Sequence, residues 1–75
     1  MPEYIKYIKV TELPIRFGQF LKLADLVQDG FEAKMIIQAG EVLVNGIRET
    51  RRGKKLKSGD RVIFGENIFE IVEGD

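Results

Sequence analysis

The stretch from Phe31 to Asp60 constrains the fold of this chain more than any other part of the sequence. Ala33, Ile36 and Ile37 are spaced at i, i+3 and i+4, which predicts a short helix with one apolar face. Gly40 follows where a residue in the left-handed conformation commonly ends a helix. The first half of this stretch is therefore expected to be a helix that stops at a glycine.

A hairpin is expected directly after that helix. Residues 42–44 are apolar and predict a strand, and Asn45-Gly46 tolerates positive φ at both positions, as a two-residue hairpin turn requires. The return strand is expected over Ile47 to Thr50. A basic loop follows, Arg51-Arg52-Gly53-Lys54-Lys55. Leu56 is its expected apolar anchor, and Ser58-Gly59-Asp60 is the next expected turn.

Together with a helix expected from Arg16 to Leu23, these elements resemble the RNA-binding domain named after ribosomal small-subunit protein S-four, also called the alpha-L motif. The matching segments are Arg16–Lys22, Glu32–Lys34, Ile37–Gly40, Val42–Gly46, Arg51–Leu56 and Gly59–Asp60. They occur in the family's order over about two-thirds of the chain, and the likeness is greatest to small, free-standing bacterial members. The resemblance implies an α+β fold, with two short helices on a small, mostly antiparallel sheet, and a single RNA-binding domain over residues 1–75.

Upstream, Tyr4 to Val10 predicts an added N-terminal strand, because the segment is rich in β-branched and aromatic residues. Lys6 and Lys9 suit an edge strand, where charge discourages pairing with other sheets; a nucleic-acid role is the alternative. Pro14 is expected in the first turn of the helix that follows.

That first helix is expected to have two distinct faces. Its core-facing stripe at i, i+3, i+4 and i+7 consists of Phe17, Phe20, Leu21 and Ala24. On another face, Arg16, Gln19 and Lys22 recur every three residues. Spacing alone leaves this face open between simple solvation and contact with phosphates or base edges, and the resemblance favours contact for Arg16.

Three residues in or near the helices have more specific expected roles. Gly18 lies inside the first helix, where glycine costs about 0.5–1 kcal/mol relative to alanine, so a close approach by the second helix or by RNA is expected. Asp29 is placed to cap the second helix, and Lys34 replaces an arginine that family members carry near its start.

Towards the end of the chain, strands are expected over Arg61–Phe64 and Ile68–Val72, with Glu70 exposed and Glu73–Asp75 frayed.

Charge is distributed unevenly along a chain whose formal net charge is zero. Seven basic residues against two acidic ones give Arg48 to Arg61 a charge of +5, and the remaining five basic and ten acidic residues leave −5 elsewhere. A local basic cluster matters more to a polyanion than the total charge does. The alternative is a solvated loop whose charge only aids solubility.

Several classes of function are disfavoured by composition. The 75 residues include no Cys and no His, which removes disulfides, thiolates, the usual general base and the commonest metal ligand. No enzymatic activity, catalytic residue, metal or cofactor is therefore expected. The beginning of the chain, Met1-Pro2-Glu3, lacks the features of a signal peptide, and no apolar run approaches the ~20 residues of a membrane helix. A cytoplasmic protein without a membrane partner is expected.

The expected function is binding of structured RNA, read through its backbone. The resemblance implies ribosomal RNA first and transfer RNA next, with a ribosomal subunit or assembly intermediate as the larger partner. A small protein-interaction module that docks on an acidic partner is the alternative, and DNA binding is a third possibility. The residues expected to contact RNA are Arg16, Gln19, Lys22, Lys34, Arg48, Arg51, Arg52, Lys54, Lys55 and Lys57.

Overall fold

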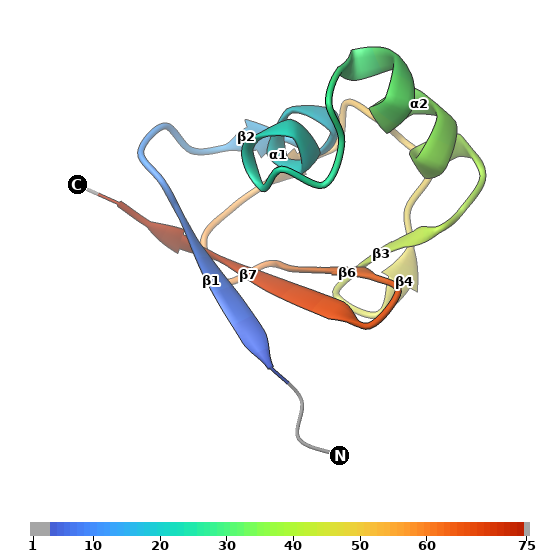
Figure 1. Cartoon of the computed structure of the whole chain (residues 1–75). Coiled ribbons are helices and arrows are strands. Elements are labelled where there is room, and N and C mark those ends of the chain that lie inside the picture. The colour runs from blue at the N-terminus through green and yellow to red at the C-terminus, as the bar shows by residue number, and fades with distance from the viewer. Residues whose placement is uncertain (1–3, 75) are drawn as a thin grey trace.

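A five-stranded sheet forms the base of the molecule in the computed structural model, which describes residues 4–74 (Figure 1). Its strand order is β1-β7-β6-β3-β4. The strands are β1 (Ile5–Val10), β7 (Asn67–Glu73), β6 (Arg61–Phe64), β3 (Val42–Val44) and β4 (Ile47–Arg48). β1 and β7 are parallel and the other pairs are antiparallel, so the sheet is mixed and mostly antiparallel, as expected.

Two short helices, α1 (Phe17–Leu23) and α2 (Gly30–Gln38), lie over one face of this sheet (Figure 1). A second, two-stranded sheet pairs β2 (Ile15–Arg16) with β5 (Lys55–Leu56). The small sheet joins the start of α1 to the loop that follows the hairpin. This α+β arrangement confirms the expected fold class and the added N-terminal strand.

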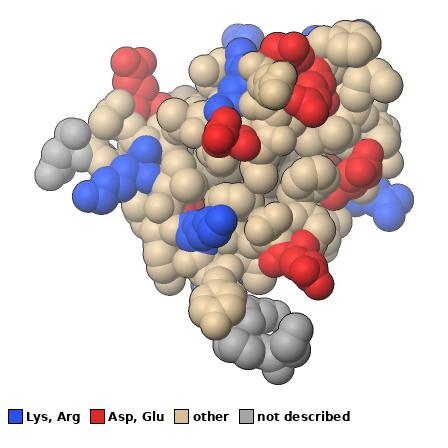
Figure 2. Space-filling view, viewed as in Figure 1, with Lys and Arg blue, Asp and Glu red and all other residues tan. Residues whose placement is uncertain are grey.

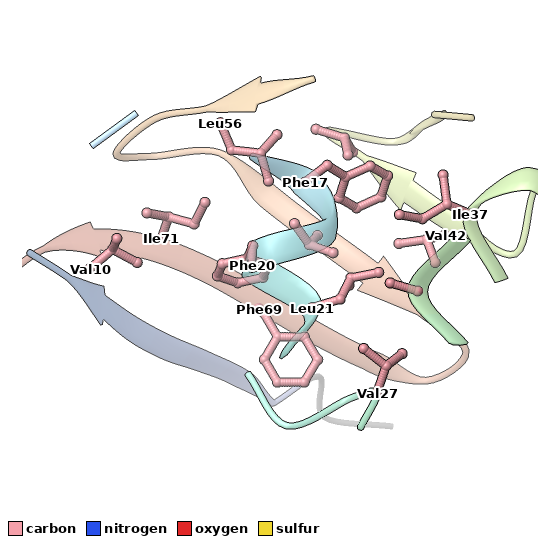
Figure 3. Close-up of a cluster of buried hydrophobic side chains, with 13 residues drawn as sticks. Val10, Phe17, Phe20, Leu21, Val27, Ile37, Val42, Leu56, Phe69 and Ile71 are labelled. Atoms are coloured by element: carbon pink, nitrogen blue, oxygen red, sulfur yellow. The ribbon is translucent and has the colours of Figure 1, made fainter. Parts of the chain in front are cut away.

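The core lies between the helices and the large sheet (Figure 3). Phe17, Phe20 and Leu21 of α1 are fully buried, and Ala24 packs against the same cluster, which confirms the predicted apolar stripe. Leu56 of β5 is also fully buried, so it anchors the basic loop as expected. Burial of an aliphatic side chain of this size stabilises the fold by about 1.5–3 kcal/mol.

The predicted caps and turns are confirmed. The Asp29 carboxylate accepts a hydrogen bond of 2.9 Å from the backbone N–H of Glu32 and so caps α2. Gly40 ends α2 with a φ of +75°. Asn45 and Gly46 turn the hairpin with φ values of +54° and +82°, the geometry that only such residues adopt readily.

Several expectations about element boundaries are wrong. Pro14 does not lie in the first turn of a helix, because Ile15 and Arg16 pair with β5 and α1 begins only at Phe17. The return strand of the hairpin is shorter than Ile47 to Thr50: β4 ends at Arg48, and the carboxylate of Glu49, the next residue, accepts a 2.9 Å hydrogen bond from the backbone N–H of Arg51.

The C-terminal strand is longer and better ordered than expected. β7 spans Asn67–Glu73, and the backbone N–H of Gly74 donates a 3.0 Å hydrogen bond to the carbonyl of Val10. Glu70 is half-buried and accepts a 2.9 Å hydrogen bond from Arg61, so its expected exposure is wrong. The predictions for Met1-Pro2-Glu3 and Asp75 lie outside the described residues.

Candidate nucleic-acid interface

The basic loop is fastened to the beginning of α1 by the backbone. The first N–H groups of any helix have no partner inside the helix. Here the Phe17 N–H donates to the Lys54 carbonyl at 2.8 Å, and the Gly18 N–H donates to the Arg52 carbonyl at 3.0 Å. These two bonds, with the β2–β5 pair, hold the loop against the helix before any ligand binds.

Gly18 is the point of closest approach between the loop and α1. A Cβ on this residue would lie 3.1 Å from the Cγ of Arg52 and 3.6 Å from the Arg52 carbonyl oxygen. The nearest neighbour is the chain's own basic loop, so the close approach that was expected from the second helix comes from this loop instead. Glycine at this position lets the Arg52 side chain lie across the helix.

A hollow of about 260 Å³ opens where α1, the beginning of α2 and the basic loop meet. We call it the basic hollow; its lining residues are Arg16, Gly18, Gln19, Lys22, Gly30, Ala33, Arg52 and Gly53. Three of these residues are cationic and none is acidic. Such a site concentrates positive potential for an anion, and arginine adds a planar fork that matches a phosphate.

Two like charges, on Arg16 and Lys55, face each other beside the hollow. Arg16 of β2 is the register partner of Lys55 of β5, so the two side chains leave the same face of the small sheet. Both residues are exposed, and among residues 4–74 no carboxylate lies within ion-pair distance of either. Like charges placed directly opposite each other are destabilising, and a bound polyanion relieves that repulsion.

Arg51 differs from its neighbour Arg52 because it is already paired. Its Nε and Nη2 donate to the two carboxylate oxygens of Glu49 at 3.0 and 3.1 Å, and its backbone N–H donates to Glu49 at 2.9 Å. These bonds lower the pKa of Glu49 from 4.5 to about 2, and they raise the pKa of Arg51. Arg51 therefore shapes the loop, and Glu49 cancels its charge.

Lys57, like Arg51, is paired with a carboxylate of the same chain. Its Nζ lies 3.6 Å from the Asp60 carboxylate, and its backbone N–H donates to the same group at 2.9 Å. Burial raises the pKa of Asp60, but the bonds from Lys57 and from the Asn45 amide outweigh it and leave that pKa below its ordinary value. Asp60 is only 7% exposed, so this cluster stabilises the turn before β6.

The remaining predicted residues occupy different places around the hollow. Lys34 is exposed on α2 and does not line the hollow. Arg48 lies at the other end of α2, where its Cδ would be 2.7 Å from a Cβ on Gly40. Lys54 is half-buried, and its carbonyl holds α1.

The structure thus brings together only part of the ten predicted residues. Arg16, Gln19, Lys22 and Arg52 come together in the basic hollow, and Lys55 lies next to Arg16. Arg48, Arg51 and Lys57 are placed or paired elsewhere.

Sequence reasoning missed the small residues that shape the hollow. Gly30, Ala33 and Gly53 line the hollow together with Gly18, and the first three were not considered for the site. An alanine in an apolar helical stripe gives no sign that it also borders a surface hollow. The glycine at position 18, which is unfavourable inside a helix, was the one sequence feature that indicated a close contact in this region. It could not indicate that the contacting residue would be Arg52.

Charge elsewhere on the surface is mixed. On the face shown in Figure 2, basic and acidic side chains are interspersed among neutral ones, so this face offers no continuous basic surface. Arg61 is in the basic segment, but its Nε lies 2.9 Å from Glu70 on the sheet. Within the described part of the chain, no helix is long and apolar enough to cross a membrane, and no group of three acidic side chains is arranged to hold a metal.

Comparison with known proteins finds one matching family model and several similar bacterial proteins. A family model described as S4 domain matches residues 8–72. A Bacillus subtilis (strain 168) protein named "Probable ribosome maturation protein RlbA" is 51% identical over 63 residues, which are 83% of this chain and 87% of that protein. The YbcJ protein of Escherichia coli (strain K12) is 33% identical over 58 residues, which are 77% of this chain and 83% of that protein.

The solution structure of YbcJ has a similar fold. It matches with a TM-score of 0.64 and 26% identity, and covers 96% of this chain and 90% of that chain. That structure is described as revealing an alpha-L motif involved in RNA-binding. A tyrosine–tRNA ligase from Burkholderia lata is 32% identical over 73 residues, which are 96% of this chain but only 18% of the ligase.

Proposed function

The chain belongs to the S4 domain family, and from this membership we propose that it is a cytoplasmic protein that binds structured RNA through the basic hollow and the loop beside it. One observation supports this most strongly: Arg52 of the basic loop meets Arg16 of β2 and Lys22 of α1 in one hollow that no carboxylate lines. Phosphate groups of folded RNA are the ligand that this arrangement suits best.

Each lining residue has a defined part in this proposal. Arg52 and Arg16 present planar forks that bind a phosphate through two hydrogen bonds, and Lys22 adds a compact charge. Gln19 supplies a neutral donor and acceptor for a phosphate or a ribose hydroxyl. Lys55 extends the cationic surface from Arg16 onto the small sheet.

Preorganisation strengthens the proposed contact. The bonds from Phe17 to Lys54 and from Gly18 to Arg52 fix the loop backbone, so little ordering is left for the moment of binding. A ligand that fits a fixed surface loses less affinity to the ordering of flexible groups. A surface of this kind reads the shape and charge of an RNA backbone, because contacts between its cations and phosphates carry no sequence information.

The proposed partner is ribosomal RNA, on a ribosomal subunit or its assembly intermediate. This rests on the similarity to the Bacillus subtilis protein, whose name refers to ribosome maturation. Transfer RNA is the second candidate, because a tyrosine–tRNA ligase includes a similar segment. The two are distinguished by competition between a ribosomal RNA fragment and a transfer RNA for the same protein.

Salt-dependent binding tests the site. For Arg52→Ala, affinity for a ribosomal RNA fragment is expected to fall, and the slope of log affinity against log salt is expected to weaken by about 0.7–0.9 if one phosphate contact is lost. Arg61→Ala is the matched control, because it removes an arginine from the same basic segment that is paired with Glu70. Arg51→Ala is expected to have an intermediate effect, since Glu49 already holds it.

Equal losses for Arg52→Ala and Arg61→Ala would contradict a site in the basic hollow. A protein partner with an acidic surface is the competing function, and the same cations support it. Pull-down from a lysate before and after ribonuclease treatment separates the two, since only a protein complex survives the nuclease.

A further inference from the structure

The outer face of α2 carries two large apolar side chains that the fold leaves in solvent. Phe31 is 72% exposed and Met35 is 56% exposed. They are four residues apart on the helix and therefore lie next to each other on its surface. The same helix contacts the core through Ala33 and Ile37, which are buried, so packing does not account for the exposed pair.

This apolar pair borders the basic hollow. Gly30 and Ala33 form the part of the hollow that belongs to α2. Successive residues of a helix are rotated by about 100°, so Lys34 lies about 40° around the helix from Gly30, and Phe31 lies about 60° further. The surface therefore passes from the hollow, across Gly30 and Lys34, to Phe31 and Met35.

We propose that Phe31, supported by Met35, stacks against an unpaired nucleobase of the RNA whose phosphates occupy the basic hollow. The inference rests on the proposed function and names the RNA more closely: a duplex interrupted by a bulged, unpaired nucleotide. A base inside a continuous A-form duplex is stacked on its neighbours and offers no free face to an aromatic side chain.

The size and surroundings of the pair favour a base over a protein surface. A stable protein interface involves roughly 20–30 residues on each side. Here the apolar area consists of two side chains, and the neighbouring positions Glu32, Lys34 and Gln38 are exposed and polar. One nucleobase is enough to cover the face of one phenylalanine, and Lys34 lies where the backbone between the hollow and that base would pass.

Three RNA hairpins test the inference on the RNA side. The first has a one-nucleotide bulge, the second has an abasic nucleotide at the same bulge, and the third is fully paired. Removal of a single stacked base is expected to weaken binding by about 5- to 150-fold. The wild-type protein is therefore expected to prefer the first hairpin over the second by that factor, because the two differ only in the base.

Substitutions at Phe31 test the inference on the protein side. Phe31→Leu keeps an apolar side chain without an aromatic face and is expected to bind the bulged and abasic hairpins equally. Phe31→Trp is expected to keep the preference for the bulged hairpin. Tyr7→Leu is the matched control, because Tyr7 is 61% exposed on β1, an edge strand that lies away from α2 (Figure 1).

The possible outcomes separate this inference from the proposed function. Equal wild-type affinity for the bulged and abasic hairpins would overturn the stacking role, and the proposed function would stand if Arg52→Ala still weakened binding. The wild-type protein could instead show no preference for the bulged base while Phe31→Ala loses a protein partner that resists ribonuclease. That result would assign Phe31 and Met35 to protein docking and would also overturn the stacking role. Failure of all three hairpins and of ribosomal RNA to bind would reject the proposed function itself.

Discussion

Replacement of Gly18 by alanine is expected to separate the stability of this protein from its affinity for RNA. Gly18 lies in the first turn of α1, and a glycine inside a helix costs about 0.5–1 kcal/mol relative to alanine. The new Cβ would be 3.1 Å from the Cγ of Arg52, which is too close, and 3.6 Å from its carbonyl oxygen, which is an ordinary contact. Only the Arg52 side chain has to move.

The magnitudes follow from these two contacts. Because Arg52 is exposed, its side chain can shift at little cost, so Gly18→Ala is expected to leave stability unchanged or to raise it by up to about 1 kcal/mol. In a domain of this size, that corresponds to a rise in Tm of no more than about 4–8 °C. A hydrogen bond to a charged group contributes about 1.5–3 kcal/mol, and Arg52 would be displaced rather than removed, so RNA affinity is expected to fall by up to about tenfold.

Thermal unfolding followed by circular dichroism measures the first effect, and a fluorescence titration with a ribosomal RNA fragment measures the second. The double variant Gly18→Ala/Arg52→Ala completes a thermodynamic cycle. If the loss of affinity acts through Arg52, the double variant binds no more weakly than Arg52→Ala alone.

Two results would refute this reasoning. A fall in Tm of several degrees would mean that the loop backbone, not the side chain, has to yield to the new methyl group. Unchanged RNA affinity in Gly18→Ala, together with a clear loss in Arg52→Ala, would mean that the position of Arg52 against α1 does not matter for binding.

Three further predictions concern the loop and its supports. Leu56→Ala removes a fully buried side chain and is expected to lower the free energy of unfolding by about 2–5 kcal/mol in urea denaturation; a loss below 1 kcal/mol would mean that the loop is anchored elsewhere. The pKa of Glu49 is lowered to about 2, so the stabilisation from its pair with Arg51 is fully present above about pH 4.5 and is lost as the pH falls towards 2. An NMR titration of the Glu49 carboxyl group measures this pKa, and a midpoint near 4.5 would contradict the pair. Asn45→Ala removes a residue with a φ of +54° and its hydrogen bonds to Asp60 and Arg61. The free energy of unfolding is expected to fall by about 1–3 kcal/mol and the pKa of Asp60 to rise, whereas wild-type stability would show that these bonds are dispensable.

Much of the fold follows from local sequence patterns. The stripe of Phe17, Phe20 and Leu21, the Asp29 cap and the Asn45-Gly46 turn each depend on neighbouring residues, so each could be predicted without knowledge of the rest of the chain. The order of these elements was also sufficient to indicate the S4 domain family. Periodicity and turn chemistry determine these features because their physical causes lie within a few residues.

The composition of the candidate site was decided by tertiary structure. Seven basic residues between Arg48 and Arg61 look alike in the sequence, but Glu49, Asp60 and Glu70 pair with three of them. The cations that face one hollow come from two segments, residues 16–22 and the basic loop, and two backbone hydrogen bonds at the start of α1 bring these segments together. The sequence by itself therefore determined that this protein carries a concentrated positive charge on an α+β frame. Only the folded chain decided which of those charges stay available, because pairing depends on distances between residues that are remote in sequence.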